Sequence, residues 1–346
     1  MTVKSDLAIV GTVGVPACYG GFETLVEYML PIPISTTVYC SSKHYSARLA
    51  SYKGANLVYL PLDANGVMSI PYDMWSLLHA GFKGHKSALV LGVSGTIILP
   101  LIRLLFPGMK LVVNVDGLEW KRDKWNGLGK FYLKFSEKVA VKFAHQIVTD
   151  NQGLADYIFD EYAAESTVIA YGGDHAFDST VPLSSNGYAF ALCRIEPENN
   201  VHLILETFSQ IEKPITFIGN WNNSEYGRKL RKTYEGYENI TLLDPVYELD
   251  KLAVLRAGCD VYIHGHSAGG TNPSLVEMMH FGKPIIAFDC VFNRYTMENL
   301  GWYFADTESL KAALDEVLVT DVPDIKALAE KRYTWGAVRE QYLQLM

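Results

Sequence analysis

The stretch Gly269 to Pro284, GGTNPSLVEMMHFGKP, has the start and stop signals of a short helix. Asn272 is a favourable N-cap, Pro273 suits the first helical position, and the final Gly-Lys-Pro ends the helix. The backbone N–H groups of Ser274 and Leu275 have no partner inside such a helix. We therefore expect these donors to face an anionic ligand.

Short apolar strands surround this helix and alternate with helical segments along the chain. In the first half we predict strands over 7–10, 37–40, 56–60, 88–93, 110–115 and 146–149. A second series follows a stretch rich in glycine and serine at 171–187, with strands over 188–193, 215–218, 240–243, 261–264 and 284–288. Such alternation predicts an α/β fold with two doubly wound parallel sheets.

Each series is long enough for a domain of its own, so we predict three parts. These are a domain at 1–180, a second domain at 181–325, and a C-terminal helix at 326–346 packing back on the first domain. Ligands bind at the carboxyl ends of strands in these folds. The predicted site is therefore a cleft across which the two domains face each other.

Composition excludes several classes of protein. The chain has 346 residues, 49% hydrophobic and 20% charged, and a formal net charge of -8, which disfavours nucleic-acid binding. The five cysteines form no C-x-x-C pair, so we expect no zinc site and a reducing, cytoplasmic location. The apolar run at 88–107 is interrupted by glycine, proline and arginine, and we interpret it as a strand and a helix rather than a membrane span.

The loop G11-TVGVPACYGG-F22 follows the first strand and could approach a phosphate or a sugar. It is neither a G-x-G-x-x-G fingerprint nor a Walker loop, and no acid ends the second strand, so nicotinamide or flavin binding is disfavoured. The alternative is that these glycines only permit a tight turn.

Arg194 follows a predicted strand, where a guanidinium suits a diphosphate. Alone it could equally be a surface ion-pair partner. Together with the helix that begins at Pro273, it forms half of an anion site. Glu277 lies one turn into that helix, where it would repel phosphate but could accept hydrogen bonds from a ribose.

The order of these motifs resembles a known family. The segments C193-RIEPENNVHLILETF-F208, A257-GCDVYIHGHSAGGTNPSLVEMM-M279 and G282-KPIIAFD-D289 resemble the C-terminal domain of family-4 glycosyltransferases, which have the GT-B fold of two Rossmann-like domains. The segments G11-TVGVPACYGGFET-T24 and V115-DGLEWKRDKW-W125 are similar to bacterial L-rhamnosyltransferases of surface-polysaccharide biosynthesis.

This resemblance implies that the first domain binds the acceptor and the second the nucleotide sugar, and it implies roles for the matching residues. Arg194 would bind the donor diphosphate, and Glu277, the second acid of the family's E-x7-E motif, would hold the nucleotide ribose. Backbone near Val246 and Tyr247 would contact the base, and Gly20 would let the first loop approach donor or acceptor. The other expected donor-binding residues are Gly21, Asn199, His266, Gly270, Thr271, Asn272, Ser274 and Leu275.

Three positions depart from the family pattern. The first acid of E-x7-E falls on Gly269, the basic residue after the arginine falls on Asn199, and a histidine of the first domain falls on Asp116. Asp116, Glu119 and Arg194 are the expected catalytic residues, the two acids by orienting hydroxyl groups. His266 could instead only cap a turn.

The chain has no D-x-D triplet, so we expect neither a metal nor a cofactor. The predicted function is retaining transfer of L-rhamnose from dTDP-L-rhamnose to an undecaprenyl-diphosphate-linked saccharide in polysaccharide or O-antigen biosynthesis. The alternatives are a hexosyltransferase that uses a UDP-sugar, a nucleotide-sugar epimerase and a nucleotide-sugar sensor. Lysines recur every four residues from Lys130 to Lys142, which suits peripheral contact with the inner face of an anionic membrane, although a solvated helix face has the same pattern.

Overall fold

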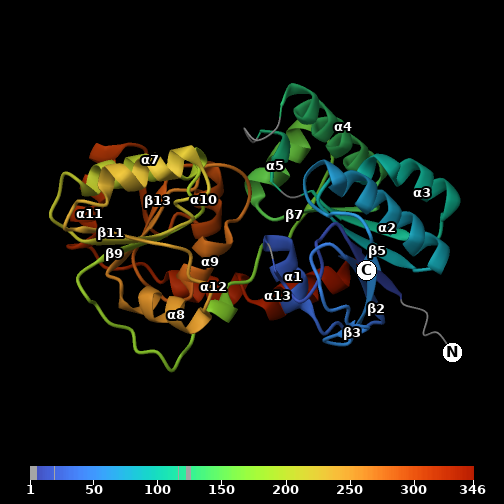
Figure 1. Ribbon diagram of the computed structural model, residues 1–346, viewed down its shortest axis with the longest axis horizontal. Coiled ribbons are helices and arrows are strands. Elements are labelled where there is room, and N and C mark those ends of the chain that lie inside the picture. The colour runs from blue at the N-terminus through green and yellow to red at the C-terminus, as the bar shows by residue number, and fades with distance from the viewer. Residues whose placement is uncertain (1–5, 19, 116, 122–125) are drawn as a thin grey trace. The chain divides into compact units, whose positions relative to one another are not determined.

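The computed structural model describes residues 6–18, 20–115, 117–121 and 126–346 (Figure 1). The chain forms two compact units, the first made of residues 1–170 with 336–346 and the second of residues 171–335. Each unit contains one sheet, and apart from β3 all described strand pairs are parallel. The predicted class, α/β with two parallel-sheet domains, is confirmed.

The first unit has an eight-stranded sheet in the order β3-β4-β2-β1-β5-β6-β7-β8. Its strands are β1 Leu7–Val10, β2 Thr36–Ser41, β3 Ser51–Tyr52, β4 Ala55–Leu60, β5 Ser87–Leu91, β6 Lys110–Asn114, β7 Gln146–Thr149 and β8 Thr167–Val168. Its helices are α1 Gly21–Met29, η1 Gly66–Met68, α2 Ser69–Lys83, η2 Thr96–Ile98, α3 Leu99–Leu105, η3 Glu119–Lys121, α4 Gly127–Phe143, α5 Gln152–Tyr162 and α13 Trp335–Gln344.

Three helices cover one face of this sheet. Leu77 of α2, Ile102 of α3 and Leu133 of α4 join a single buried cluster with strand residues such as Val90 and Val113. The strands are apolar at successive positions because helices pack on both faces of a parallel sheet. The continuous apolar runs in the sequence have this origin.

The second unit has a six-stranded sheet in the order β11-β10-β9-β12-β13-β14. Its strands are β9 Ala189–Leu192, β10 Ile215–Ile218, β11 Ile240–Leu243, β12 Val261–His264, β13 Ile285–Phe288 and β14 Trp302–Phe304. Its helices are η4 Asp174–Ala176, η5 Pro197–Asn199, α6 Val201–Phe208, α7 Glu225–Tyr234, α8 Leu249–Gly258, α9 Pro273–Met279, α10 Val291–Met297, α11 Thr307–Val317 and α12 Ile325–Arg332.

This strand order is that of a dinucleotide-binding fold, in which the chain leaves β9 in one direction and returns through β12 on its other side. The register pairs Ala189 of β9 with Val261 of β12. In sheets of this order the connections from the two neighbouring strands run to opposite faces, and the place beyond their carboxyl ends is the crevice at which ligands bind. In the second unit this place lies after Leu192 and His264.

The boundaries between the units differ from the predicted ones at 180/181 and 325/326. Residues 171–180 belong to the second unit because Gly173 packs against the backbone of Val276, and Phe177 against Phe281. The segment expected to be one helix over 326–346 is two helices, of which α12 packs on α9 in the second unit.

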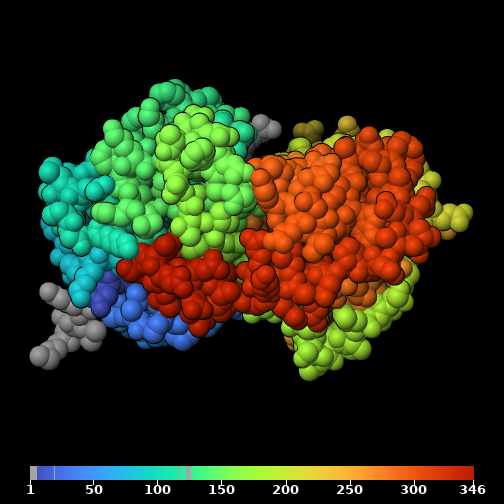
Figure 2. All heavy atoms as spheres, turned by 180° about the vertical axis from the view of Figure 1, so that it is seen from behind, coloured from blue at the N-terminus to red at the C-terminus, as the bar shows by residue number. Residues whose placement is uncertain are grey.

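Residues 336–346 return to the first unit. The Tyr342 hydroxyl accepts a hydrogen bond from Asn114 at 2.8 Å, and Arg339 donates to the carbonyl oxygen of Tyr28 at 3.0 Å. Figure 2 shows this last segment, in red, beside blue and green residues of the first unit.

Candidate functional site

Arg194 lies just beyond the carboxyl end of β9, beside the crevice of the second unit. Its side chain is 55% exposed, and its guanidinium lies 3.7 Å from Glu196, whose side chain is 36% exposed. An ion pair this exposed holds an arginine only weakly. The Arg194 guanidinium, which was predicted to bind a diphosphate, can therefore reach a bound molecule.

Asn199 and His266, two of the predicted donor-binding residues, connect the loops that follow β9 and β12. The Asn199 amide donates to the carbonyl oxygen of Arg194 at 2.6 Å, and its Oδ1 accepts from His266 Nδ1 at 2.6 Å. Both side chains are buried, at 3% and 8% exposure. Gly265 makes this approach possible, because a Cβ there would lie 2.1 Å from the Asn199 carbonyl oxygen. Asn199 thus fixes the loop that carries Arg194.

A row of buried polar side chains continues from His266 along β12. The His264 ring lies 6.2 Å from that of His266 and 5.8 Å from that of Tyr262. Burial, reinforced by His266, holds the pKa of His264 well below its usual value, so the imidazole is neutral. The Tyr262 hydroxyl lies 3.2 Å from Ser274 Oγ, which connects the row to α9.

The start of α9 differs from expectation. Asn272 is the N-cap, as predicted, but its Oδ1 accepts from the Ser274 N–H at 3.0 Å, and its carbonyl oxygen accepts from the Leu275 N–H at 3.1 Å. The prediction that these two donors lack partners is wrong. Gly270 and Thr271, in the preceding loop, are buried.

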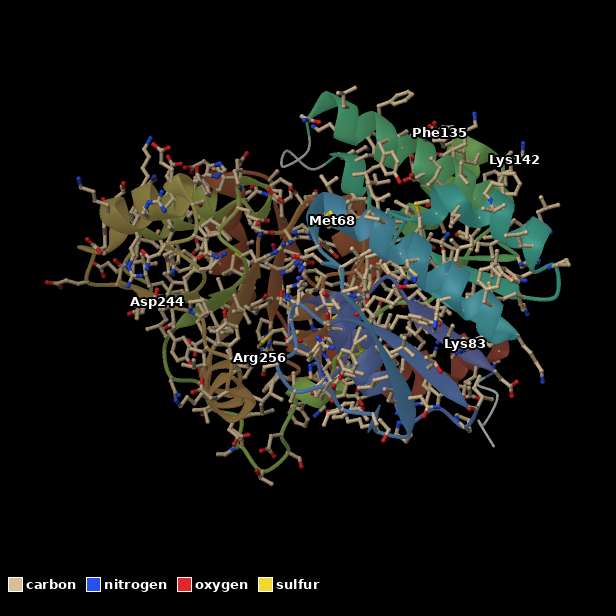
Figure 3. The ribbon with its side chains drawn as sticks, turned by 45° about the vertical axis from the view of Figure 1, so that its right-hand side comes forward. Met68, Lys83, Phe135, Lys142, Asp244 and Arg256 are labelled. Atoms are coloured by element: carbon tan, nitrogen blue, oxygen red, sulfur yellow. The ribbon has the colours of Figure 1, made fainter. Side chains whose placement is uncertain are left out.

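Glu277 is held from inside the protein by two partners that the sequence analysis missed. Arg256 of α8 pairs with Oε2, and Nε2 of His175 lies 3.5 Å from Oε1. Arg256 is 2% exposed and the Glu277 side chain 15%. Figure 3 labels Arg256 in the second unit. Burial lowers the pKa of His175, more than the nearby Glu277 raises it, so His175 is neutral at pH 7.

Two predicted base-contacting residues, Val246 and Tyr247, follow β11 at the edge of the sheet. Tyr247 is 84% exposed. Asp116 lies outside the described residues. Glu119 opens the 3₁₀ helix η3 of the first unit, and the neighbouring Trp120 donates to Glu137 of α4 at 3.1 Å.

The loop that holds Gly20 is closed by Glu23, another residue the sequence analysis missed. Glu23 Oε1 accepts from the Val13 N–H at 2.7 Å and from the Thr12 hydroxyl at 2.8 Å. Its Oε2 accepts from the Gly20 N–H at 2.8 Å, and Gly21 is the first residue of α1. The Glu23 carboxylate thus already accepts the hydrogen bonds that these groups would have to donate to a phosphate.

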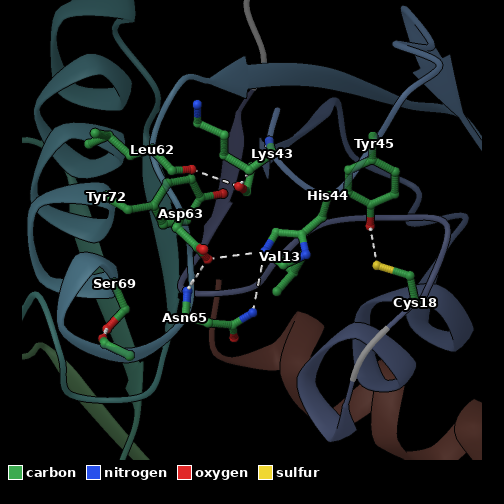
Figure 4. A network of polar contacts seen from close by, with 12 residues as sticks. Val13, Cys18, Lys43, His44, Tyr45, Leu62, Asp63, Asn65, Ser69 and Tyr72 are labelled. Atoms are coloured by element: carbon green, nitrogen blue, oxygen red, sulfur yellow. Dashed lines mark hydrogen bonds and ion pairs between the residues drawn. The ribbon is translucent and has the colours of Figure 1, made fainter.

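A polar network lies at the carboxyl ends of β2 and β4 in the first unit (Figure 4). Nε2 of His44 is hydrogen-bonded to the Asp63 carboxylate at 3.0 Å, and the Asn65 N–H donates to the same carboxylate at 2.8 Å. This network orders the loops at the ligand-binding edge of the sheet. Nothing in the sequence had pointed to it.

The lysines of α4 separate into two kinds. Lys138 and Lys142 are exposed, in a stripe that also presents Leu128, Phe131 and Phe135. Lys134 turns inward, where it pairs with Glu161 at 3.1 Å and lies 4.7 Å from the centre of the Trp120 ring. The lysines thus recur at a regular spacing but do not all lie on the same surface of the helix.

Among the residues that the structure describes, no helix is long and apolar enough to cross a membrane. Over the same residues, histidine, cysteine and acidic side chains nowhere gather in a group of three that could hold a metal ion.

Comparison with known families divides the chain in two. Residues 4–174 match a family described as a domain of unknown function, DUF1972, and residues 179–334 match Glycosyl transferases group 1. No curated protein matches the chain. With Arg194 at the crevice of a dinucleotide-binding fold, the second match identifies the protein as a glycosyltransferase.

Solved structures show the same architecture. Sucrose-phosphate synthase from Thermosynechococcus elongatus superposes with a TM-score of 0.81 at 13% identity, over 98% of this chain and 97% of that one. The Anabaena HepE complex with UDP-glucose gives 0.73 at 13% identity, over 98% of both chains. The catalytic domain of starch synthase IV from Arabidopsis thaliana, bound to ADP and acarbose, gives 0.72 at 13% identity, over 99% and 98%. The fold is GT-B.

Proposed function

We propose that this enzyme transfers L-rhamnose from dTDP-L-rhamnose to a lipid-linked saccharide, with retention of the anomeric configuration. The observation that carries the proposal is Arg194, an exposed cation at the crevice of the nucleotide-binding type of sheet. The HepE and starch synthase structures, named with UDP-glucose and ADP, support a nucleotide-linked donor. The rhamnose assignment rests on the resemblance of residues 11–24 and 115–125.

The reaction breaks the bond between the anomeric carbon and the diphosphate, and a new bond forms to an acceptor oxygen. The protein must stabilise the negative charge that develops on the departing diphosphate. We assign that task to Arg194. We assign to Glu277 the binding of the sugar ring in the nucleoside part of the donor. The acceptor proton passes to an oxygen of the departing diphosphate, and we propose that Arg194 takes the place of a metal ion because the chain has no D-x-D triplet.

A competition among donors tests this proposal. The enzyme receives dTDP-L-rhamnose, UDP-glucose, UDP-N-acetylglucosamine and GDP-mannose with one undecaprenyl-diphosphate-linked acceptor, and mass spectrometry follows every product. We expect the rhamnosylated lipid and free dTDP, in excess EDTA as well, with the configuration retained by NMR. Preference for a UDP-hexose would overturn the donor. A new nucleotide sugar without acceptor would show an epimerase, and binding without turnover a sensor.

We further propose that α2, α3 and α4 contact the anionic membrane that carries the acceptor. Large apolar side chains are exposed on all three helices: Trp75, Phe82, Leu101, Leu104, Leu105, Leu128, Phe131 and Phe135. Figure 3 labels Lys83 of α2 and Phe135 and Lys142 of α4. Large apolar side chains exposed on neighbouring helices in this way mark a candidate interaction site.

The charges on these three helices favour an anionic lipid surface as the partner of their exposed apolar side chains. Besides Lys134, which turns inward, the three helices carry five basic residues, Lys83, Arg103, Lys130, Lys138 and Lys142, although the whole chain has a net charge of -8. Their two acids, Asp73 and Glu137, are both buried. Burial raises the pKa of Asp73 well above its usual value, which disfavours a negative charge there. Basic residues among apolar ones suit anionic headgroups over an acyl layer.

The double variant Lys138→Glu/Lys142→Glu should lose binding to vesicles that contain anionic phosphatidylglycerol. Each basic residue near such a surface contributes about 1 kcal/mol, so two reversals should weaken binding by at least about 30-fold. The matched control is Lys229→Glu/Lys232→Glu, which reverses two exposed lysines on α7 of the second unit. Cosedimentation measures binding. Equal losses in both variants, or binding to neutral vesicles alone, would contradict the proposal.

A further inference from the structure

Glu277 lies at one end of a chain of buried polar contacts within the second unit. Arg256 comes from α8, Glu277 from α9, His175 from η4, and Trp335 from the last residue of the unit. The Trp335 indole Nε1–H donates to His175 Nδ1 at 2.9 Å, and its backbone N–H donates to Asp174 at 2.8 Å. Segments separated by 160 residues in the sequence thus converge on one carboxylate.

The tryptophan determines which nitrogen of His175 carries the proton. An indole N–H can only donate, so Nδ1 of the histidine must accept. The histidine is neutral because burial lowers its pKa, and its proton therefore lies on Nε2. Nε2, which carries the proton, lies 3.5 Å from Glu277 Oε1.

The two partners of Glu277 leave part of its carboxylate available. Arg256 contacts Oε2 and His175 lies beside Oε1, while each carboxylate oxygen can accept two hydrogen bonds. The side chain remains 15% exposed, so its outer side reaches the surface. A carboxylate held in this way is oriented before the ligand arrives, which removes an entropic cost of binding.

We propose that Arg256, His175 and Trp335 are positioning residues that hold Glu277 for the sugar hydroxyls of the donor nucleotide. This inference rests on the proposed function, in which Glu277 binds that ring. The four residues act in sequence: tryptophan fixes the histidine tautomer, and histidine and arginine fix the carboxylate. None of the three positioning residues needs to touch the donor.

The test is Trp335→Phe, which removes the indole N–H and keeps an aromatic ring. We expect the donor KM to rise about 3- to 10-fold, the loss of one hydrogen bond, with kcat unchanged. The matched control is Trp221→Phe, because Trp221 is buried in the same unit and donates instead to the Leu243 carbonyl oxygen at 2.8 Å. That control should leave the donor KM as it is in the unchanged protein.

Nucleoside diphosphates that lack sugar hydroxyls separate positioning from a general structural effect. Calorimetry compares UDP with 2′,3′-dideoxy-UDP, and dTDP with 3′-deoxy-dTDP. We expect Trp335→Phe to weaken binding of UDP and dTDP and to leave binding of the deoxy analogues unchanged. Equal weakening of both kinds of ligand, or no weakening, would overturn the inference. If the unchanged protein binds no nucleotide, the proposed function itself fails.

Discussion

Glu277→Ala is expected to destabilise the second unit by about 3–5 kcal/mol, because it leaves the Arg256 charge buried and unpaired. Arg256 is 2% exposed, and among the described residues its Nη1 already has no hydrogen-bond partner. The substitution also removes the proposed contact between Glu277 and the donor nucleotide. The structure makes stability the larger effect.

Hydrogen exchange of peptides within residues 171–335 measures this loss where it arises, alongside urea unfolding. Arg256→Met combined with Glu277→Leu removes both charges and should recover most of the stability, because an apolar pair can replace a buried ion pair. The control is Glu248→Ala, which breaks an exposed pair with Lys251 and should not change the unfolding midpoint. Full protection of residues 171–335 in Glu277→Ala would contradict the buried-charge argument.

The sheets were predictable because parallel strands are apolar at every position. The strands β10, β11 and β12 begin and end at the predicted residues. The missed strands, β3, β8 and β14, have two or three residues, too few for any pattern to appear. Their existence depends on neighbouring strands, for example β13, whose Ile286 pairs with Trp302.

The error at α9 came from using the capping preference of asparagine to place the helix start without counting the hydrogen bond that its side chain accepts. An asparagine is a good N-cap because its side chain accepts a hydrogen bond from the second or third helical residue. The same feature that placed the helix start at Asn272 therefore implied that the Ser274 N–H has a partner. A helix capped in this way has fewer donors to offer to a phosphate, which leaves more of the binding to Arg194.

The partners of Glu277 could not be predicted, because they depend on tertiary structure. Arg256 lies 21 residues and His175 about 100 residues before it in the sequence. A charged residue beside the apolar Ala257 in α8 was the available signal for a buried arginine. The structure places His175, whose side chain is 9% exposed, beside Glu277 of the candidate site.

Arg194→Ala is expected to lower kcat/KM for the donor by about 10- to 150-fold, which corresponds to roughly 1.5–3 kcal/mol for a charge-assisted contact with the diphosphate. Its side chain is 55% exposed and lies 3.7 Å from Glu196, so its removal should not change stability. Arg194→Lys should recover only part of the activity, because an ammonium group keeps the charge but cannot form the paired contact of a guanidinium.

The matched control is Arg332→Ala, since Arg332 is 45% exposed and also pairs with a glutamate, Glu298. Steady-state rates at limiting and saturating donor distinguish the two possible roles of Arg194. A contact made equally in the ground state and the transition state would raise KM alone, whereas stabilisation of the leaving diphosphate lowers kcat as well. We expect both to change, because negative charge grows on the diphosphate as the bond breaks. Unchanged kinetics in Arg194→Ala would place the nucleotide elsewhere.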